Sequence, residues 1–239
     1  MINLAHKTDA GRSLPEALFI IGAGHFGFRA ARLLSGKGGR SIWVVDKDKE
    51  ALDQFRDLNV HQVEADGVAF LTERADLFSQ KSIVVPAVPF HLAYAFAKMA
   101  LRDTTKFVPV EIPQQIKPLL PHVWDGPDGS LLVSFADFRC PDDCPEPLYC
   151  TVTGEKRDRP LYQLLQELPV AGFNIHVIRS RQLAPGLGGY AISELFGLCS
   201  KLRQMPDSKW LLATSCKCHG VLNGFMVTRN EAKTLEPKG

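Results

Sequence analysis

The sequence predicts an α/β protein with a doubly wound, mostly parallel sheet of the Rossmann type, followed by a C-terminal α/β extension that carries a cysteine cluster. Three observations lead to this fold class. Short apolar runs alternate with helical patterns over residues 17–112, a glycine-rich turn follows the first run, and an aspartate ends the second. Strands that alternate with helices join through right-handed crossovers into a parallel sheet.

The elements of this first part follow in order. Residues 18–21 form a continuous apolar run, which is typical of a buried parallel strand. In the helix that follows, Phe26, Ala30, Leu33 and Leu34 are expected on one face. The same reasoning predicts further strands at 41–48, 59–66, 82–88 and 106–112, and helices at 49–58, 67–78 and 89–101.

The pattern changes after residue 112. Residues 113–130 contain four prolines and the turn sequence DGPDGS, which indicates a linker or a domain edge. We therefore divide the chain into a dinucleotide-binding domain at 1–115 and a cysteine-containing α/β domain or sheet extension at 116–239. In the second part we expect strands at 130–138, 172–180, 209–215 and 224–229, and helices at 160–168 and 190–203.

Composition excludes several function classes. The net charge is +2 and no basic run stands out, so we expect no nucleic-acid partner. The N-terminal stretch 1–16 lacks the apolar segment of a signal peptide. The most apolar segment, 82–100, is interrupted by two prolines and predicts a buried strand and helix, not a membrane span. We expect a cytoplasmic protein, in which clustered cysteines more often bind metal than form disulfides.

The glycine-rich turn predicts a dinucleotide site. Gly22 permits a tight turn, Gly24 a close approach of the pyrophosphate, and Gly27 close packing of helix on strand. Asp46 ends the second strand, where its carboxylate holds the adenosine ribose and disfavours a 2′-phosphate. NAD(H) is therefore favoured over NADP(H), although Lys47 weakens this exclusion. FAD, S-adenosylmethionine, a bare adenine nucleotide, or a plain strand–helix turn are the alternatives.

The stretches FIIGAGHFGFRAARLL, IWVVDKDKEALDQF and VHQVEAD resemble the NAD-binding domains of the Trk/RCK type that regulate potassium transport, over residues 17–112. The glycines, the end of the second strand and Asp66 match that pattern. His25 stands where the family usually has arginine, and Ala65 where it usually has glycine. The resemblance implies a Rossmann fold, bound NAD and a membrane-transport partner. We count His25, Phe26 and Asp66 with the nucleotide-binding candidates.

His91 is the candidate catalytic residue. It follows the fourth predicted strand, and strand ends in doubly wound folds point at the cofactor crevice. There an imidazole faces a nicotinamide and shuttles a proton. The alternative is a solvent-facing histidine in the first turn of a helix.

Five cysteines form two groups that each follow a predicted strand. If those strands share a sheet and run parallel, both groups emerge at the same edge and meet. The chain has no Cys-x2-Cys knuckle, and prolines follow two of the cysteines, which favours an iron–sulfur cluster over zinc. The fourth ligand is expected from the second group, with His219 in reserve, and the alternative is a set of inert thiols. The candidate ligands are Cys140, Cys144, Cys150, Cys216 and Cys218.

These observations predict an NAD(H)-binding protein with a cysteine-ligated metal, acting as a redox-linked oxidoreductase or as a sensor of redox state or nucleotide. One alternative is a non-catalytic nucleotide-sensing subunit with structural zinc. Another is an NAD-dependent enzyme that uses His91 on a small organic substrate. The expected partners are the nucleotide, a redox or membrane-transport protein, and a second copy of the chain in a homodimer.

Overall fold

The structure, a computed structural model, describes residues 16–36, 39–74 and 79–230. The stretch 1–15, to which the signal-peptide expectation applies, and the end of the helix predicted at 67–78 lie outside the described residues. None of the helices within the described residues combines the length and the apolar character of a membrane span.

The first sheet has the strand order β3-β2-β1-β4-β10-β9. The first four of these strands run parallel, whereas β10 and β9 are antiparallel additions. This arrangement confirms the predicted α/β fold class with a Rossmann-like N-terminal part. The strands are β1 (Ala17–Ile21), β2 (Ser41–Asp46), β3 (His61–Glu64), β4 (Ile83–Pro86), β9 (Arg181–Ala184) and β10 (Leu187–Ala191).

Helices connect these parallel strands. All five residues of β1 are buried, as expected for a central strand with both faces covered. The first helix buries Ala30, Ala31 and Leu34, but Phe26 is 50% exposed, so its expected place on the buried face is wrong. Phe26 lies in the first turn of this helix and lines a cavity there. The helices are α1 (His25–Leu34), α2 (Lys49–Asp53), α3 (Gly67–Arg74) and α4 (Leu92–Ala100).

The second sheet has the order β6-β7-β12-β11-β8, with β5 paired to β12. Its strands are antiparallel neighbours apart from the parallel pair β11 and β8. Its elements and the remaining helices are β5 (Thr105–Pro109), η2 (Gln114–Leu119), β6 (His122–Asp125), η3 (Pro127–Gly129), β7 (Leu131–Ser134), α5 (Leu161–Gln166), β8 (Phe173–Arg179), α6 (Ile192–Gln204), β11 (Ser208–Ser215) and β12 (His219–Arg229).

The strand predicted at 106–112 belongs to this second sheet and not to the parallel one. In β5, Phe107 stacks on Phe225 of β12, with ring centroids 5.2 Å apart, so the strand gains its apolar partner there. The place beside β4 is taken by β10, where Tyr190 pairs with Val84. The helix expected from residue 190 therefore begins at Ile192, after this strand.

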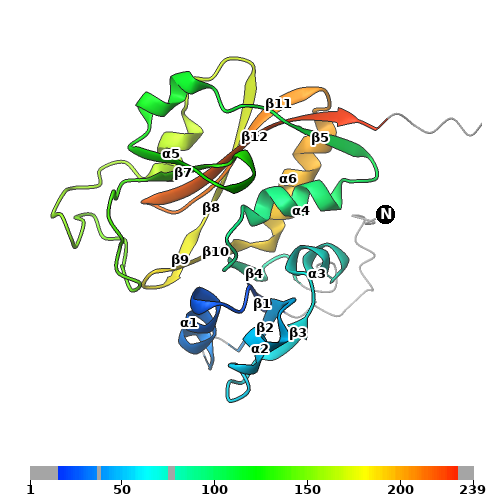
Figure 1. The fold of residues 1–239 in the computed structure, drawn as a ribbon, viewed down its shortest axis with the longest axis vertical. Helices are drawn as coiled ribbons and strands as arrows, with labels where there is room; N and C mark the ends of the chain where they lie inside the picture. Colours follow the sequence, from blue (N-terminus) through cyan, green and yellow to red (C-terminus); the bar gives the residue numbers. More distant parts are fainter. Residues whose placement is uncertain (1–15, 37–38, 75–78, 231–239) are drawn as a thin grey trace, which may run out of the picture.

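The two sheets share one hydrophobic core. Phe19 of β1, Phe96 of α4 and Phe225 of β12 belong to it. In Figure 1 the first sheet lies in the lower half, the second in the upper half, and α4 and α6 lie between them. A second core joins the first sheet to α1 and α2, and a third lies under α5 and η2.

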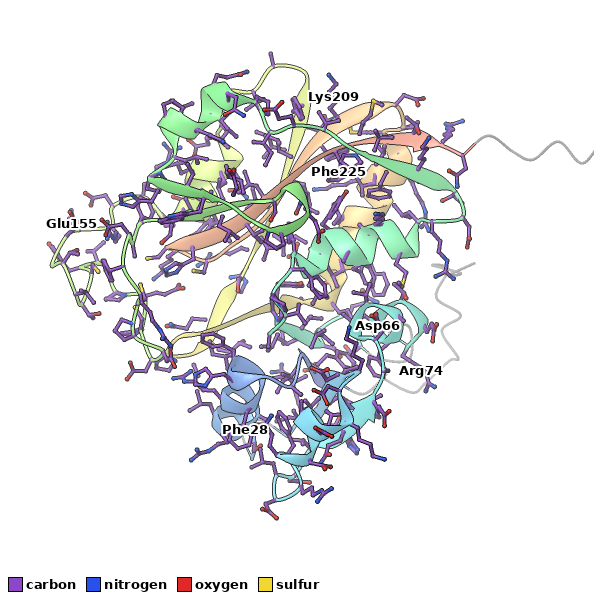
Figure 2. The ribbon with its side chains drawn as sticks, in the orientation of Figure 1. Phe28, Asp66, Arg74, Glu155, Lys209 and Phe225 are labelled. Atoms are coloured by element: carbon purple, nitrogen blue, oxygen red, sulfur yellow. The ribbon has the colours of Figure 1, made fainter. Side chains whose placement is uncertain are left out.

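A long loop and a strand turn set up the candidate site. The loop comprises residues 135–160, between β7 and α5, and we call it the cysteine loop. Figure 2 shows Glu155 where this loop projects from the side of the molecule. Strands β7 and β11 both run antiparallel to β12, which lies between them, so they point the same way. Their carboxyl ends therefore emerge at the same edge, where the Phe135 N–H donates to the Cys218 carbonyl at 2.9 Å.

Candidate functional site

The turn Gly22–Gly27 contains two glycines at which a side chain would not fit and one, Gly24, at which it would. Gly22 has φ +108°, and a Cβ there would collide with the carbonyl oxygen of Ala87. A Cβ at Gly27 would collide with the carbonyl oxygen of Gly22. A Cβ at Gly24, by contrast, would meet no described atom within 4 Å, and Gly24 is exposed. The turn therefore has open space in front of it at Gly24.

The start of α1 is free to receive an anion. Among the described residues no side chain caps it, and its first turn contains no acidic residue. Unpaired N–H groups and the helix dipole favour a negative group at such an end. These features fit a pyrophosphate at Gly24.

Asp46 lies beside this turn at the end of β2. Its carboxylate accepts hydrogen bonds from the N–H of Ala23 at 2.6 Å and of Asp48 at 2.9 Å. Lys47 follows and is exposed. The carboxylate is thus fixed at the strand end, and its role toward a ribose stays a prediction.

Asp66 has a defined local role at the next strand end. Its carboxylate accepts from the N–H groups of Val68 and Ala69, both at 2.9 Å. These contacts cap the start of α3. A role of Asp66 in nucleotide binding stays a prediction beside this structural one.

His91 is buried, so the alternative of a solvent-facing histidine is wrong. Its Nδ1 donates to Asn223 Oδ1 at 2.8 Å, since an amide oxygen only accepts, and its Nε2 accepts from the Thr214 hydroxyl at 2.9 Å. Burial lowers the pKa of His91 to about 4. The neutral ring therefore connects the start of α4 to β11 and β12. Both of its ring nitrogens are engaged in these hydrogen bonds. An acid/base role for His91 stays a prediction.

The structure brings the two cysteine groups together. They line one cavity of about 360 Å³, which we call the thiol cavity. Cys140 Sγ lies 3.5 Å from His219 Nε2, and Cys216 Sγ lies 3.8 Å from His219 Nδ1. All six cysteines lie within the described residues and are free thiols. The residues of the two groups on the wall are Cys140, Cys144, Cys150, Cys216, Cys218 and His219.

The thiol cavity also reaches the nucleotide turn. Phe26 of α1 and Pro86 at the end of β4 form part of its wall. His25 Nε2 contacts Asp142 Oδ2 of the cysteine loop at 2.7 Å. The cavity therefore lies between the open face of the Rossmann-like part and the cysteine loop.

Further hydrogen bonds hold the cysteine loop in place. The Cys144 carbonyl accepts from the N–H of Gly186 at 2.7 Å and from Gln182 Nε2 at 2.9 Å. A Cβ at Gly186 would collide with the carbonyl of Asp142, so this close approach needs glycine. The loop thus rests on the β9–β10 hairpin of the first sheet.

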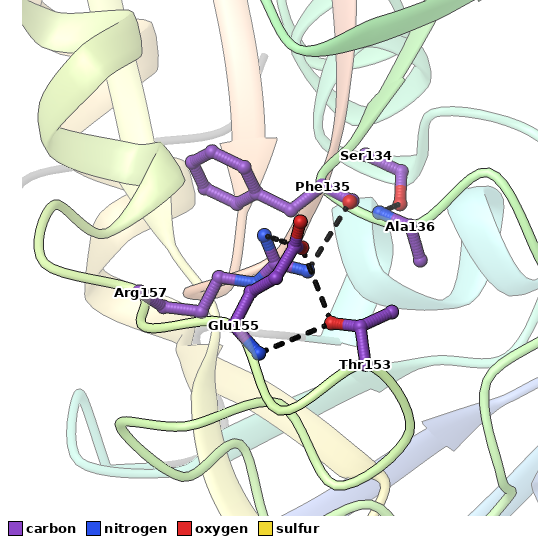
Figure 3. Close-up of polar contacts among 6 residues, drawn as sticks. All are labelled: Ser134, Phe135, Ala136, Thr153, Glu155 and Arg157. Carbon is purple, nitrogen blue, oxygen red and sulfur yellow. Dashed lines mark hydrogen bonds and ion pairs between the residues drawn. The ribbon is translucent and has the colours of Figure 1, made fainter.

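Arg157 organises the far side of the loop (Figure 3). Its guanidinium donates to the carbonyl of Phe135 at 3.3 Å and pairs with Glu155 at 3.1 Å. It also lies over the Phe135 ring, 5.2 Å from the centroid. The Glu155 carboxylate in turn accepts from the Thr153 hydroxyl at 3.1 Å. Only 12% of the Arg157 side chain is exposed, so its charge is held within the loop.

Burial keeps most of these thiols protonated in the absence of a cation. It raises the pKa of Cys216 and Cys140, raises that of Cys218 to about 11, and lowers the pKa of His219. Cys150 differs, because the backbone N–H groups of Thr153 and Val152 lower its pKa to about 7. Across the described residues, no three Cys, His, Asp or Glu side chains are close enough together to hold a metal ion as they stand. The thiols therefore line one cavity, but their positions are not those of a complete set of metal ligands.

Two protein-family models match the chain. One, described as TrkA-N domain, matches residues 18–85, and this match confirms the resemblance found in the sequence. The other, described as Uncharacterized protein, C-terminal domain, matches residues 90–228. A protein of Archaeoglobus fulgidus described as an uncharacterized protein is 27% identical over 222 residues, which cover 86% of this chain and 97% of that protein. The similarity to that protein therefore extends over most of both chains.

Proposed function

Since the chain belongs to the family defined by the C-terminal domain at residues 90–228 and carries a TrkA-N domain before it, we propose that it is an NAD(H)-binding sensor whose nucleotide site opens into a metal–thiolate centre. One observation carries this proposal. Phe26 and Pro86 of the nucleotide-binding part line the same cavity as five cysteines of the C-terminal part. A nucleotide bound at the glycine turn would therefore lie next to the thiol cavity.

The residues at the glycine turn fit NAD(H). Gly24 leaves room for the pyrophosphate, and the uncapped start of α1 provides N–H donors for it. Asp46 holds the ribose hydroxyls and repels a 2′-phosphate. When bound, NAD(H) supplies a nicotinamide whose oxidation state follows the redox state of its surroundings. TrkA-N domains generally bind NAD(H), which supports the same choice.

The thiol cavity has the donor set of a soft metal. Thiolates bind zinc and iron–sulfur clusters in preference to hard cations. The 3.5 Å between Cys140 Sγ and His219 Nε2 matches the separation of two ligands on one tetrahedral zinc, about 3.5 Å from ordinary bond lengths. Because burial raises the pKa of Cys216 and Cys218, metal binding releases protons there. With an iron–sulfur cluster the centre would be redox-active and the sensor redox-linked, whereas with zinc the centre would only stabilise the structure.

TrkA-N regulators typically act with transport proteins, and we propose a membrane-transport partner and a cytoplasmic location for this chain. The outer part of the cysteine loop offers a contact surface. Leu148, Tyr149 and Val152 are 53%, 57% and 54% exposed there. Such exposed apolar side chains are typical of interaction sites.

Calorimetric titration of the full chain with NAD⁺ and with NADH tests the nucleotide site. Gly24→Asp places a carboxylate in front of the α1 start without a clash, and we expect it to weaken binding by at least about 100-fold. Gly197→Asp in α6 is the matched control, because a Cβ there also meets no described atom within 4 Å. Equal affinity in wild type and Gly24→Asp, or no binding by wild type, would contradict the proposal.

Metal and acid-labile sulfide analysis of anaerobically purified protein tests the thiol centre. Cys140→Ala and Cys216→Ala are expected to lose the metal together, since they come from the two groups that line the cavity. Cys199→Ala is the control, because Cys199 is buried in α6 within the main core. Iron with sulfide supports the redox form and zinc the structural form. Retention of metal in both cavity variants, or absence of metal from wild type, argues against the centre.

A further inference from the structure

The second sheet is interrupted beside β12, and a cavity opens at the break. β7 pairs with β12 over His219–Leu222, whereas β5 pairs with it over Phe225–Arg229 (Figure 1). Because β11 occupies the other edge of β12, β7 and β5 follow one another along the same edge. Asn223 and Gly224 lie between the two pairings and line a cavity of about 420 Å³, which we call the strand-break cavity. Cavities of this size hold small organic molecules.

The Asn223 amide is a buried donor that is held in one orientation. Asn223 is 3% exposed, and its amide oxygen accepts from His91 at 2.8 Å. Since the Thr214 hydroxyl engages the other ring nitrogen of His91, the ring and the amide are both fixed. The amide nitrogen has no hydrogen-bond partner among the described residues, yet it is not one of their fully buried unpartnered atoms. It therefore reaches solvent at the cavity that Asn223 lines and offers two N–H donors there.

Tyr94 of α4 adds a second donor to the same wall. Its ring packs against Phe225, with centroids 5.1 Å apart, and the residue lines the strand-break cavity. Within the part of the chain that the structure describes, its hydroxyl makes no hydrogen bond. Burial and the nearby Asp128 carboxylate raise the pKa of Tyr94, so the hydroxyl keeps its proton. Two neutral donors without protein partners suit a carbonyl or carboxylate oxygen of a ligand.

Charged side chains line another part of the strand-break cavity. The Lys117 ammonium lies 3.7 Å from Asp125 Oδ1, so these two charges compensate each other. Glu111 accepts from the neutral Gln114 amide at 2.6 Å, and the Asp128 carboxylate lies in the same lining. Neither Glu111 nor Asp128 forms an ion pair with a described residue. These two carboxylates suit a cationic group such as an ammonium.

Apolar side chains complete the wall and have room for an aliphatic or aromatic group. We propose that the strand-break cavity binds a free amino acid with an apolar side chain. Its carboxylate accepts hydrogen bonds from Asn223 and Tyr94, and its ammonium group pairs with the carboxylates that lack a protein partner. The site is separate from the nucleotide turn and goes beyond the proposed function. The apolar residues of the lining are Pro109, Val110, Ile112 and Leu131.

The experiment is calorimetric titration of the full chain with L-leucine, L-isoleucine, L-valine, L-methionine and L-phenylalanine, each separately. For each amino acid that binds, one analogue without the ammonium group and one without the carboxylate are titrated as well. For leucine these analogues are isocaproate and isopentylamine. We expect at least one amino acid to bind, and each of its analogues to bind at least about tenfold more weakly.

Three variants locate the binding at the strand-break cavity. Tyr94→Phe removes only the hydroxyl and is expected to weaken binding roughly three- to tenfold. Asp128→Asn removes one exposed charge, and the expected loss is roughly two- to fivefold. Asn223→Asp keeps an acceptor for His91 but removes both N–H donors, and we expect a loss of at least about tenfold.

Two replacements of the same kind outside the described lining are the matched controls. Asp207 is exposed and has φ 54°, close to the φ of 55° at Asp128, so Asp207→Asn reproduces both the charge change and the backbone setting. Tyr162 is a half-buried tyrosine of α5, and Tyr162→Phe removes its hydroxyl. Both controls should bind the amino acid with wild-type affinity.

Three results overturn the proposal. One is that none of the five amino acids binds to wild type, and another is that both analogues bind as tightly as their amino acid. The third is wild-type affinity in both Tyr94→Phe and Asp128→Asn, which decide the question even if circular dichroism shows that Asn223→Asp is unfolded. The NAD⁺ and NADH titrations concern a different cavity, so failure of the amino-acid site and failure of the nucleotide site are distinguishable.

Discussion

His25 Nε2 lies 2.7 Å from Asp142 Oδ2, although 117 positions separate the two residues in the chain. The contact joins the first turn of α1 to the cysteine loop and so connects the nucleotide turn with the thiol cavity. The hydrogen bond from His25 holds the pKa of the Asp142 carboxyl below its usual range, and the nearby charges of Arg139 and Arg29 lower it further.

His25→Ala is expected to loosen the cysteine loop with little change in global stability. The contact is partly exposed, with 65% of the His25 side chain accessible, so water competes for both groups and the contact adds little to global stability. Hydrogen exchange followed by mass spectrometry should show faster exchange in residues 138–150. Arg56→Ala removes another exposed ion pair, with Asp53, and should leave that segment unchanged. Wild-type exchange of the loop in His25→Ala would mean that other contacts hold it.

Gly27→Ala is expected to destabilise the fold, whereas Gly24→Ala is not. The added Cβ at Gly27 meets the backbone carbonyl of Gly22, which has no room to move, and the expected loss is about 2–4 kcal/mol. At Gly24 the same Cβ meets open space, and φ is −72°, which alanine adopts readily. Urea unfolding of the two variants measures the difference. Equal stabilities would show that the turn relaxes around the new methyl group.

Local patterns in the sequence were enough to predict the glycine turn, the alternating strands and helices, and the carboxylate at the end of β2. Each of these has a local signature: Gly22 has a positive φ within its own turn, Gly27 is needed by the carbonyl of Gly22 five positions earlier, and Asp46 ends its own strand. The meeting of the two cysteine groups was predicted conditionally, from the direction of the strands that precede them. The relative direction of two strands depends on the strands between them in the sheet. The sequence therefore predicts that the cysteine groups meet only if β7 and β11 run parallel, and the structure shows that they do.

Contacts between segments far apart in the chain could not be predicted from the sequence. The strand Thr105–Pro109 has the apolar pattern of any short strand, and its partner β12 begins more than a hundred positions later. The burial of His91 depends on Thr214 and Asn223, from two strands of the second sheet. No sequence pattern distinguishes Asp142 and Glu146 from other loop acids, because their place on the cavity wall depends on the folded position of the cysteine loop.

His91 should make stability depend on pH in a defined window. Its pKa is about 4 in the folded chain and about 6.5 when unfolded, so the unfolded state binds the extra proton between these values. The contribution is fully present above pH 6.5 and is lost as the pH falls toward 4, by about 3 kcal/mol in total. Chemical unfolding at several pH values should therefore give a shallower decline for His91→Gln than for wild type.

The control for this prediction is His122→Gln. His122 is exposed on β6, and its replacement should preserve the wild-type decline. His176, whose pKa burial also lowers to about 4, contributes equally to wild type and both variants. Parallel declines for wild type and His91→Gln would show that His91 is not the group responsible.

Arg157→Lys is expected to weaken the cysteine loop although it keeps the charge. The planar guanidinium contacts the Phe135 carbonyl, the Glu155 carboxylate and the face of the Phe135 ring together, and an ammonium group has no such geometry. We expect a loss of about 1–2 kcal/mol and a several-fold faster reaction of the cavity thiols with a disulfide reagent. Urea unfolding and the rate of thiol modification in metal-free protein measure the two effects.

Arg159→Lys separates this role from a general effect of charge on the loop. Arg159 pairs with Glu167 of the α5 end, and 49% of its side chain is exposed, so the same replacement should change neither stability nor thiol reactivity by much. If Arg157→Lys reacts at the wild-type rate, the guanidinium does not control access to the thiols. If both variants react faster, the effect belongs to the whole segment between the cysteine loop and α5.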